Sequence, residues 1–124
     1  MLSFRQLLGQ QGESSAAHFL KSKGYEIIEK NYRCTYGEID LIVRDNEIIV
    51  FVEVKTRSSK AFGGPAAAVN YRKQNQISKV AQHFLVDKKL GDVDARFDVV
   101  SIVAKNGKPL QIEHLTDAFE FTIS

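Results

Sequence analysis

Three charged residues interrupt one of the most apolar stretches of this 124-residue chain. The segment from Gly37 to Arg57 is rich in isoleucine and valine, yet it contains Asp40, Glu53 and Lys55. A carboxylate buried in a strand is costly unless it is paired or binds a cation. Converging carboxylates are hard oxygen ligands that suit Mg²⁺ or Mn²⁺. A lysine beside them can orient an attacking water and stabilise charge that grows on a phosphate.

The spacing of these charges decides whether they meet. Side chains repeat every two residues along a strand, so Glu53 and Lys55 share a face. A hairpin loop of two residues would put Asp40 on that face too. The loop Asn46-Glu47 places Asp40 directly opposite Glu53, and the loop Asp45-Asn46 places it on the diagonal. A loop of three residues would separate the two acids. Convergence is therefore expected but not forced, and an ion pair of Lys55 with Glu53 or Asp40 is the structural alternative.

Polar residues on two expected helices are aimed at the same sheet. Glu13 heads a stripe at helical spacing with Ala16, Ala17 and Leu20, so it should face the sheet. Its alternative role is to complement the helix dipole. Lys73 and Gln74 extend the apolar stripe of the second helix back to its start, and ordinary polarity at a helix start is the alternative there.

The basic residues are unevenly distributed. The chain has a net charge of +2, but the window from Lys55 to Lys79 contains six basic residues and no acidic one, so the remainder is acidic. A basic segment beside acidic strands suits a phosphate-rich partner, whereas the alternative is a solvated loop and helix face. The candidate nucleic-acid-binding residues are Arg57, Lys60, Arg72, Lys73, Gln74 and Lys79.

Other residues that often carry chemistry indicate structural roles. No two of His18, His83 and His114 stand at metal-ligand spacing, and we expect them at the surface or its boundary. Cys34 is the only cysteine, which excludes an intrachain disulfide. Arg96 and Asp98 share a strand face and are expected to form a structural pair. The start of the chain has no signal-peptide pattern and no apolar run could span a membrane, so we expect a cytoplasmic protein.

The elements that must position these residues follow from periodicity and turn signals. Their order, α-β-β-β-α-β-β, predicts an α/β fold with a mixed central sheet flanked by helices, in a single domain over residues 1–124. The C-terminal residues are expected to cover a sheet edge. The first helix, over 13–23, has an alternative start near Phe4, and the expected hairpin turn is Asn106-Gly107. The expected strands are 25–33, 37–44, 47–56, 96–104 and 110–115, and the second helix is 66–89, ended by Gly91.

Asp40, followed after twelve residues by Glu53-Val54-Lys55, resembles the PD-(D/E)XK nuclease signature. More closely, the chain resembles the YraN-like family of small bacterial predicted endonucleases. The matching stretches are Gly12-Glu13 with Ala16, Gly37-Glu38-Ile39-Asp40, Phe51 to Arg57, Phe62-Gly63, and Arg96-Phe97-Asp98. One departure is Ile39, which stands where the signature has proline.

The resemblance implies a restriction-endonuclease-like fold and kinship with archaeal-type Holliday junction resolvases. It implies that Asp40 and Glu53 bind Mg²⁺ or Mn²⁺ with the Val54 carbonyl, and that Lys55 is the catalytic lysine. Glu13 resembles the additional helical acid of resolvase-like members. The expected function is metal-dependent endonucleolytic hydrolysis of DNA, with branched or junction structures among the candidate substrates.

Two other function classes stay open at this point. One is a nucleic-acid-binding module without turnover, and the other is a protein-interaction subunit of a DNA repair or uptake assembly. The intact set of carboxylates and lysine favours the enzyme, because a binding module has no use for clustered buried acids. The expected partner is DNA rather than a membrane, and a homodimer is one candidate assembly.

Overall fold

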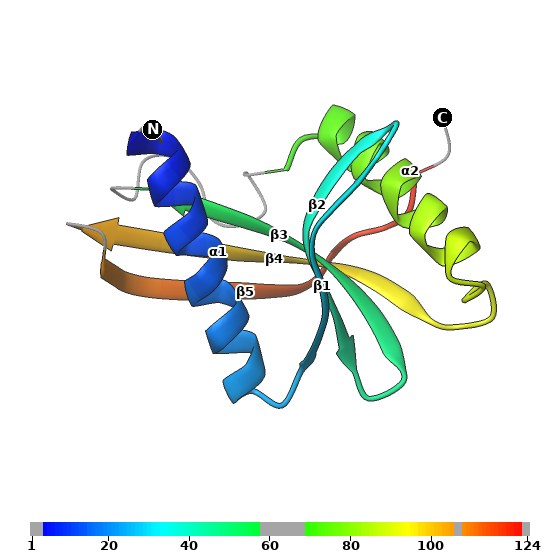
Figure 1. Ribbon diagram of the computed structural model, residues 1–124, viewed down its shortest axis with the longest axis horizontal. Helices are drawn as coiled ribbons and strands as arrows, with labels where there is room; N and C mark the ends of the chain where they lie inside the picture. The colour runs from blue at the N-terminus through cyan, green and yellow to red at the C-terminus, as the bar shows by residue number, and fades with distance from the viewer. Residues whose placement is uncertain (1–3, 58–68, 106–107, 123–124) are drawn as a thin grey trace.

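A mixed five-stranded sheet with one helix packed on each face forms the core of the molecule (Figure 1). The computed structural model describes residues 4–57, 69–105 and 108–122. The sheet order is β1-β2-β3-β4-β5, and only β3 and β4 pair in parallel, with α2 in the connection between them. The predicted fold class and element order are confirmed. The elements are α1 (Phe4–Ser22), β1 (Glu26–Cys34), β2 (Gly37–Asp45), β3 (Ile48–Arg57), α2 (Tyr71–Asp87), β4 (Ala95–Lys105) and β5 (Lys108–Phe119).

The central strands are buried on both faces, which explains their nearly continuous apolar sequence. Along β3, Ile49 and Phe51 pack in the layer under α2, whereas Val50 and Val52 pack in the layer under α1. The α1 layer also contains Ala16, Ala17, Leu20, Leu41, Val43, Val100 and Ile102. The α2 layer also contains Ile39, Ile42, Ile77, Val80, Ala81, Phe84, Phe97 and Val99.

The first helix begins at Phe4, which agrees with the earlier of the two expected starts. Gly9 and Gly12 lie inside it and do not end it. Gly12 is buried against β3, and a Cβ atom at this position would collide with the side chain of Thr56. Glycine therefore allows the helix to approach the strand closely. The next residue is Glu13, so this approach also sets where that acid lies.

The second helix is shorter than predicted at both ends. It begins at Tyr71 rather than at residue 66, because Asn70 caps it by accepting a hydrogen bond from the backbone N–H of Lys73 (2.9 Å). It ends at Asp87 and not near Gly91, because Lys88 caps it and Lys89 adopts a left-handed conformation with φ 57°.

The C-terminal part differs from expectation in two ways. The last strand continues to Phe119, beyond the predicted 110–115. The residues after it pack under α2 instead of covering a sheet edge: the Phe121 ring lies 4.4 Å from that of Phe97, and the Thr122 N–H donates to Ser78 Oγ (3.1 Å). The expected turn Asn106-Gly107 lies outside the described residues.

Candidate active site

The hairpin of β2 and β3 realises one of the two alternatives that bring the acids together. Asp45 pairs with Ile48, so the loop is Asn46-Glu47, and Asn46 has the left-handed φ of 55° that such a tight turn requires. The recorded pairs run from there to Leu41 and Val52. One further step in the same register would set Asp40 opposite Glu53, just beyond the last pair.

The two strands separate at this step. Figure 1 shows β2 curving with β1 toward the start of α2, while β3 continues beside β4. A carboxylate oxygen of Asp40, Oδ2, accepts the backbone N–H of Val54 at 2.8 Å, in place of a strand carbonyl. Asp40 therefore sits in the fork between the diverging strands, where a side chain can reach backbone groups of β3.

Glu53 lies in the same fork, where burial and the Asp40 carboxyl both oppose its ionisation. Its Oε2 is buried and has no hydrogen-bond partner among the residues that the structure describes. Burial, followed by the hydrogen bond to the Asp40 carboxyl and the charge of Asp40, raises the pKa of Glu53 to about 9. Two carboxyl groups so close in a buried site oppose each other's ionisation, because their like charges repel. Without a cation, the pair therefore cannot be fully ionised at neutral pH.

Two further acids adjoin this pair. With its amide nitrogen turned toward them, Asn31 donates to Glu13 Oε1 (2.8 Å) and Glu38 Oε1 (3.0 Å). Arg33 forms an ion pair with Glu38 at 3.3 Å. Burial, and then the charges of Asp40 and Glu38, raise the pKa of Glu13 to about 7. The fork thus gathers carboxylates from α1, β2 and β3, and Glu13 faces the sheet as its helical position predicted.

Two lysines lie near these acids. Lys55 lies two residues beyond Glu53 on the same strand and is exposed. Lys73 reaches the site from the first turn of α2, and the charges of Lys73 and Lys55 partly offset the rise in the pKa of Glu53. Among the described residues, neither Asp40 nor Glu53 lies within 4.0 Å of the Lys55 ammonium group. The structural alternative of a close ion pair with Lys55 is therefore not realised.

The donor set of the fork fits Mg²⁺ or Mn²⁺. Glu53 Oε2 is a buried acceptor without a partner among the described residues, and the Asp40 carboxyl lies beside the Glu53 carboxyl. The carbonyl of Val54 points to the same side of β3 as its N–H, which meets Asp40. No three His, Cys, Asp or Glu side chains within the described ranges form a ready metal cage. Two carboxylates and a carbonyl leave positions for waters, which Mg²⁺ keeps readily.

The basic residues predicted to bind nucleic acid are divided by the fold. Arg72 and Lys73 line a hollow of about 500 Å³ at the start of α2, together with Asn70 and Gln76. Lys79 lies farther along the exposed side of the same helix. Gln74 points elsewhere: its Nε2 donates to the Val69 carbonyl (3.0 Å). Arg57 ends β3, and Lys60 lies outside the described residues.

Comparison of the sequence with known proteins shows which family the chain belongs to. The model of the family described as "Uncharacterised protein family UPF0102" matches residues 12–102. This chain belongs to the UPF0102 family. A UPF0102 protein of Geotalea uraniireducens is 52% identical over 113 residues, which are 91% of this chain and 89% of that protein. One of Geobacter sulfurreducens is 47% identical over 114 residues, which are 92% of this chain and 89% of that protein. The YraN-like resemblance is thereby confirmed at the level of the family.

Similarity to solved structures is looser. A structure of Pyrococcus furiosus SfsA in complex with Ca²⁺ matches 90% of the UPF0102 chain and 63% of its own, with a TM-score of 0.41 and 12% sequence identity. At that level of similarity it carries no argument about activity. None of the helices that the structure describes is long and apolar enough to cross a membrane.

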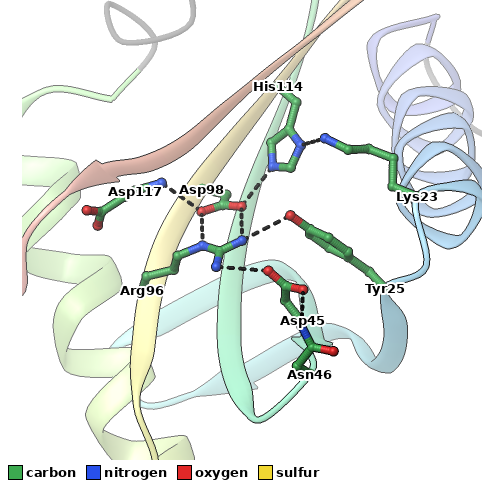
Figure 2. Close-up of polar contacts among 8 residues, drawn as sticks. All are labelled: Lys23, Tyr25, Asp45, Asn46, Arg96, Asp98, His114 and Asp117. Carbon is green, nitrogen blue, oxygen red and sulfur yellow. Dashed lines mark hydrogen bonds and ion pairs between the residues drawn. The ribbon is translucent and has the colours of Figure 1, made fainter.

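A second polar cluster of this UPF0102 chain was only partly foreseen (Figure 2). The expected pair of Arg96 and Asp98 is confirmed, with Arg96 Nε 3.0 Å from Asp98 Oδ1. His114 was expected at the surface or its boundary, and it lies at that boundary: the residue is partly buried, with 3% of its side chain exposed, and its Nε2 lies 2.7 Å from Asp98 Oδ2. Lys23 Nζ donates to His114 Nδ1 (2.8 Å), so Nε2 carries the proton and donates to Asp98.

Every charge in this second cluster has partners. Asp98 also accepts the backbone N–H of Asp117 (2.9 Å), and Arg96 donates to Asp45 Oδ2 (3.1 Å) and Tyr25 (3.0 Å). Burial alone would raise the pKa of Asp98, but the hydrogen bonds from His114 and Arg96 hold it below its usual value. We therefore assign this cluster to stability.

Asn31 and Gly12 are the residues of the candidate site whose roles sequence reasoning missed. Asn31 adopts a left-handed conformation with φ 53° in the middle of β1, a position for which asparagine is suited. An asparagine in a strand was the available signal, because this residue is depleted from strands. Gly12 entered the sequence analysis only through the family resemblance, and its role in close packing shows only when the helix lies against Thr56.

Proposed function

We propose that this UPF0102 protein hydrolyses phosphodiester bonds in DNA with the help of Mg²⁺ or Mn²⁺. The observation that carries the proposal is the buried, unpartnered Oε2 of Glu53 beside the Asp40 carboxyl, at a fork between two strands. A carboxyl pair that resists ionisation destabilises the metal-free fold, and a bound cation removes that penalty. A purely structural role does not account for this cost.

The residues of the fork then have distinct tasks. Asp40, Glu53 and the Val54 carbonyl would hold the metal, which when bound supplies positive charge that neutralises a phosphate oxygen. Lys55 is exposed at the mouth of the fork, where its ammonium group orients a water and stabilises the charge that develops on phosphorus oxygens. Glu13 has a pKa of about 7, which suits a carboxylate that accepts a proton from that water near neutral pH. Arg72 and Lys73 hold the backbone beside it.

The test separates chemistry from binding. The protein is incubated with duplex, single-stranded and branched DNA, with Mg²⁺, with Mn²⁺ and with a chelator. We expect metal-dependent cleavage of at least one substrate. Lys55→Ala should lower the rate about 100- to 1,000-fold, as the loss of one transition-state contact does. DNA affinity should change little, because Lys55 is one cation among several. Lys21→Ala removes an exposed lysine of α1 and should cleave like wild type.

Each negative outcome favours a different function or mechanism for this protein. Salt-sensitive DNA binding without cleavage under any condition would overturn the hydrolytic proposal and favour the non-enzymatic binding module. If the protein binds no nucleic acid at all, the remaining function class is a protein-interaction subunit. Equal cleavage by wild type and Lys55→Ala would remove Lys55 from the mechanism.

A further inference from the structure

An exposed stripe on α2 leads away from the candidate site. It consists of Arg72, Gln76, Lys79, His83 and Val86, whose spacing of four, three, four and three residues places them on one side of the helix. Lys73, next to the first member of the stripe, is close enough to Glu53 to affect its pKa. At a rise of about 1.5 Å per residue, Lys79 lies about 9 Å and His83 about 15 Å along the axis from Lys73.

The far part of the stripe borders a cavity of about 620 Å³, whose described walls include Tyr36, Lys79, His83 and Val86. Two of the wall residues are large hydrophobic side chains that lie exposed to solvent: Tyr36 is 52% and Val86 77% exposed. Tyr36 lies in the short connection between β1 and β2, opposite the helix. The cavity is thus a slot with an exposed tyrosine and an exposed valine in its walls, and its other described walls are polar: Lys79, Gln82, His83, Asp87 and Thr122.

The walls of this slot are fixed by contacts between the hairpin and the helix. Gln76 Nε2 donates to the carbonyl of Tyr36 (3.1 Å), and Tyr32 Oη lies at hydrogen-bond distance from His83 Nδ1 (2.7 Å). Gly37 has φ 143°, and a Cβ there would meet Gln76 Nε2 at 2.7 Å. The hairpin tip is therefore held against α2, and the slot is preformed.

We propose that a single-stranded arm of the DNA runs along this stripe and inserts an unpaired base into the slot, where it stacks on Tyr36. The inference rests on the proposed function and names its substrate class: DNA with an unpaired extension beside the cleaved bond. An aromatic face stacks with any base, whereas bases inside a duplex are already stacked on one another. Arg72 and Lys79 supply the positive charge that follows the backbone of such an arm.

The charges along the stripe support a DNA arm that runs from the fork to the slot. Arg72 and Lys73 lie between the acidic fork and the slot, and Lys79 lines the slot itself. The acidic group at the slot, Asp87, stands at the end of the helix with Lys88 3.8 Å away. The separation of about 9 to 15 Å spans a few nucleotides, at about 3.4 Å per nucleotide in a duplex strand. An arm of three to five unpaired nucleotides is long enough to reach from the fork into the slot.

The experiment measures affinity for a labelled duplex with and without a five-nucleotide single-stranded extension, by fluorescence anisotropy without divalent metal. We expect the extension to tighten binding to wild type. Tyr36→Ala should weaken binding of the extended DNA about 5- to 150-fold, the range for loss of one stacked base. Tyr36→Phe should retain it. Tyr71→Ala is the matched control, because Tyr71 is a second exposed tyrosine (65%) at the start of the same helix, and it should bind like wild type.

A salt titration adds an independent readout. Lys79→Ala should reduce the log–log salt slope for the extended DNA by about 0.7, the value for one phosphate contact on a single strand. Equal affinity for both DNAs, or equal binding by wild type and Tyr36→Ala, would overturn the inference. Metal-dependent cleavage of plain duplex would still leave the proposed function standing. Conversely, binding that depends on the extension without any cleavage would support the slot and refute the hydrolysis.

Discussion

The two carboxylate clusters on this sheet differ in whether their charges are balanced. In one, Asp98 is fully buried and accepts hydrogen bonds from Arg96, His114 and the Asp117 backbone (Figure 2). In the other, a buried oxygen of Glu53 has no partner within the described ranges, and the Asp40 carboxyl lies beside it. Burial opposes ionisation at both sites, yet the pKa of Asp98 is lowered and that of Glu53 is raised to about 9.

The difference shows how a buried acid can be assigned to structure or to function. A buried charge with a complete set of partners stabilises the fold. Removing it leaves those partners unpaired in the low-dielectric interior, which costs stability. A charge without partners costs stability in the free protein and is retained where a ligand supplies what is missing. Both acids are anomalies in apolar strands when the sequence is read alone, and only their partners separate them.

The sharpest way to break this comparison is to remove Asp98. Asp98→Ala leaves the mostly buried Arg96 without its main partner, which should cost about 3–5 kcal/mol of unfolding free energy. Urea denaturation at neutral pH measures this loss. Because the pKa of Asp98 is lowered in the folded state, its contribution is present at neutral pH and is lost as pH falls below the usual range of an aspartate. A loss below about 1 kcal/mol would contradict the structural role.

A second test concerns the helix that carries Glu13 to the fork. Gly12→Ala introduces a Cβ that collides with Thr56, so we expect urea denaturation to show a loss of about 1–3 kcal/mol in unfolding free energy. Metal-dependent cleavage should also slow, because Glu13, the proposed proton acceptor, is displaced. Gly9→Ala is the matched control, because nothing lies within 4 Å of its added Cβ. It should stabilise the helix by up to about 1 kcal/mol. The opposite result for the two glycines would mean that α1 does not depend on this close approach.

The smallest expected effect sharpens the contrast at the fork itself. Asp40→Asn keeps an oxygen for the Val54 N–H and replaces a repelling carboxyl with an amide that can donate to Glu53. Without metal, this variant should be more stable than wild type by about 1 kcal/mol at neutral pH. Asp92→Asn, an exposed change elsewhere, should have no such effect.

The pH and metal dependence of the same variant complete this prediction. The pKa of Glu53 is about 9 in the folded protein and near 4.5 when unfolded, so the folded state binds more protons and wild-type stability falls as pH rises between these values. Asp40→Asn should make this fall shallower. Mg²⁺ at about 100 times its dissociation constant should stabilise wild type by about 2.7 kcal/mol, and the variant should lose most of that gain. Equal stabilisation of both proteins would place the metal elsewhere.

Much of the candidate site followed from the chain alone, because its residues break a local rule. Asp40, Glu53 and Lys55 are conspicuous in strands that are otherwise apolar, and the period of two residues put the last two on one face. The choice of loop was not decided locally. Only the paired strands show that it is Asn46-Glu47, the register that directs the two acids to the same face.

Other residues escaped prediction because their partners are distant in sequence. Asn31 meets Glu13 and Glu38 only after the helix has packed on the sheet. The side chain of His114 is buried because β5 pairs with β4 and brings it to Asp98, sixteen residues away. A lone histidine near the end of a strand carries no local signal of such a partner.

The sequence by itself determined the order of the elements, the two-sided burial of the central strands and the identity of the anomalous acids. These depend on periodicity and turn chemistry, which act over a few residues. The tertiary structure decided which acids are satisfied and which are not. That distinction depends on the fork where β2 leaves β3, on the approach of Gly12 to Thr56 and on the hairpin tip held against α2. Each of these joins segments far apart in the chain, and only the packed fold brings them into contact.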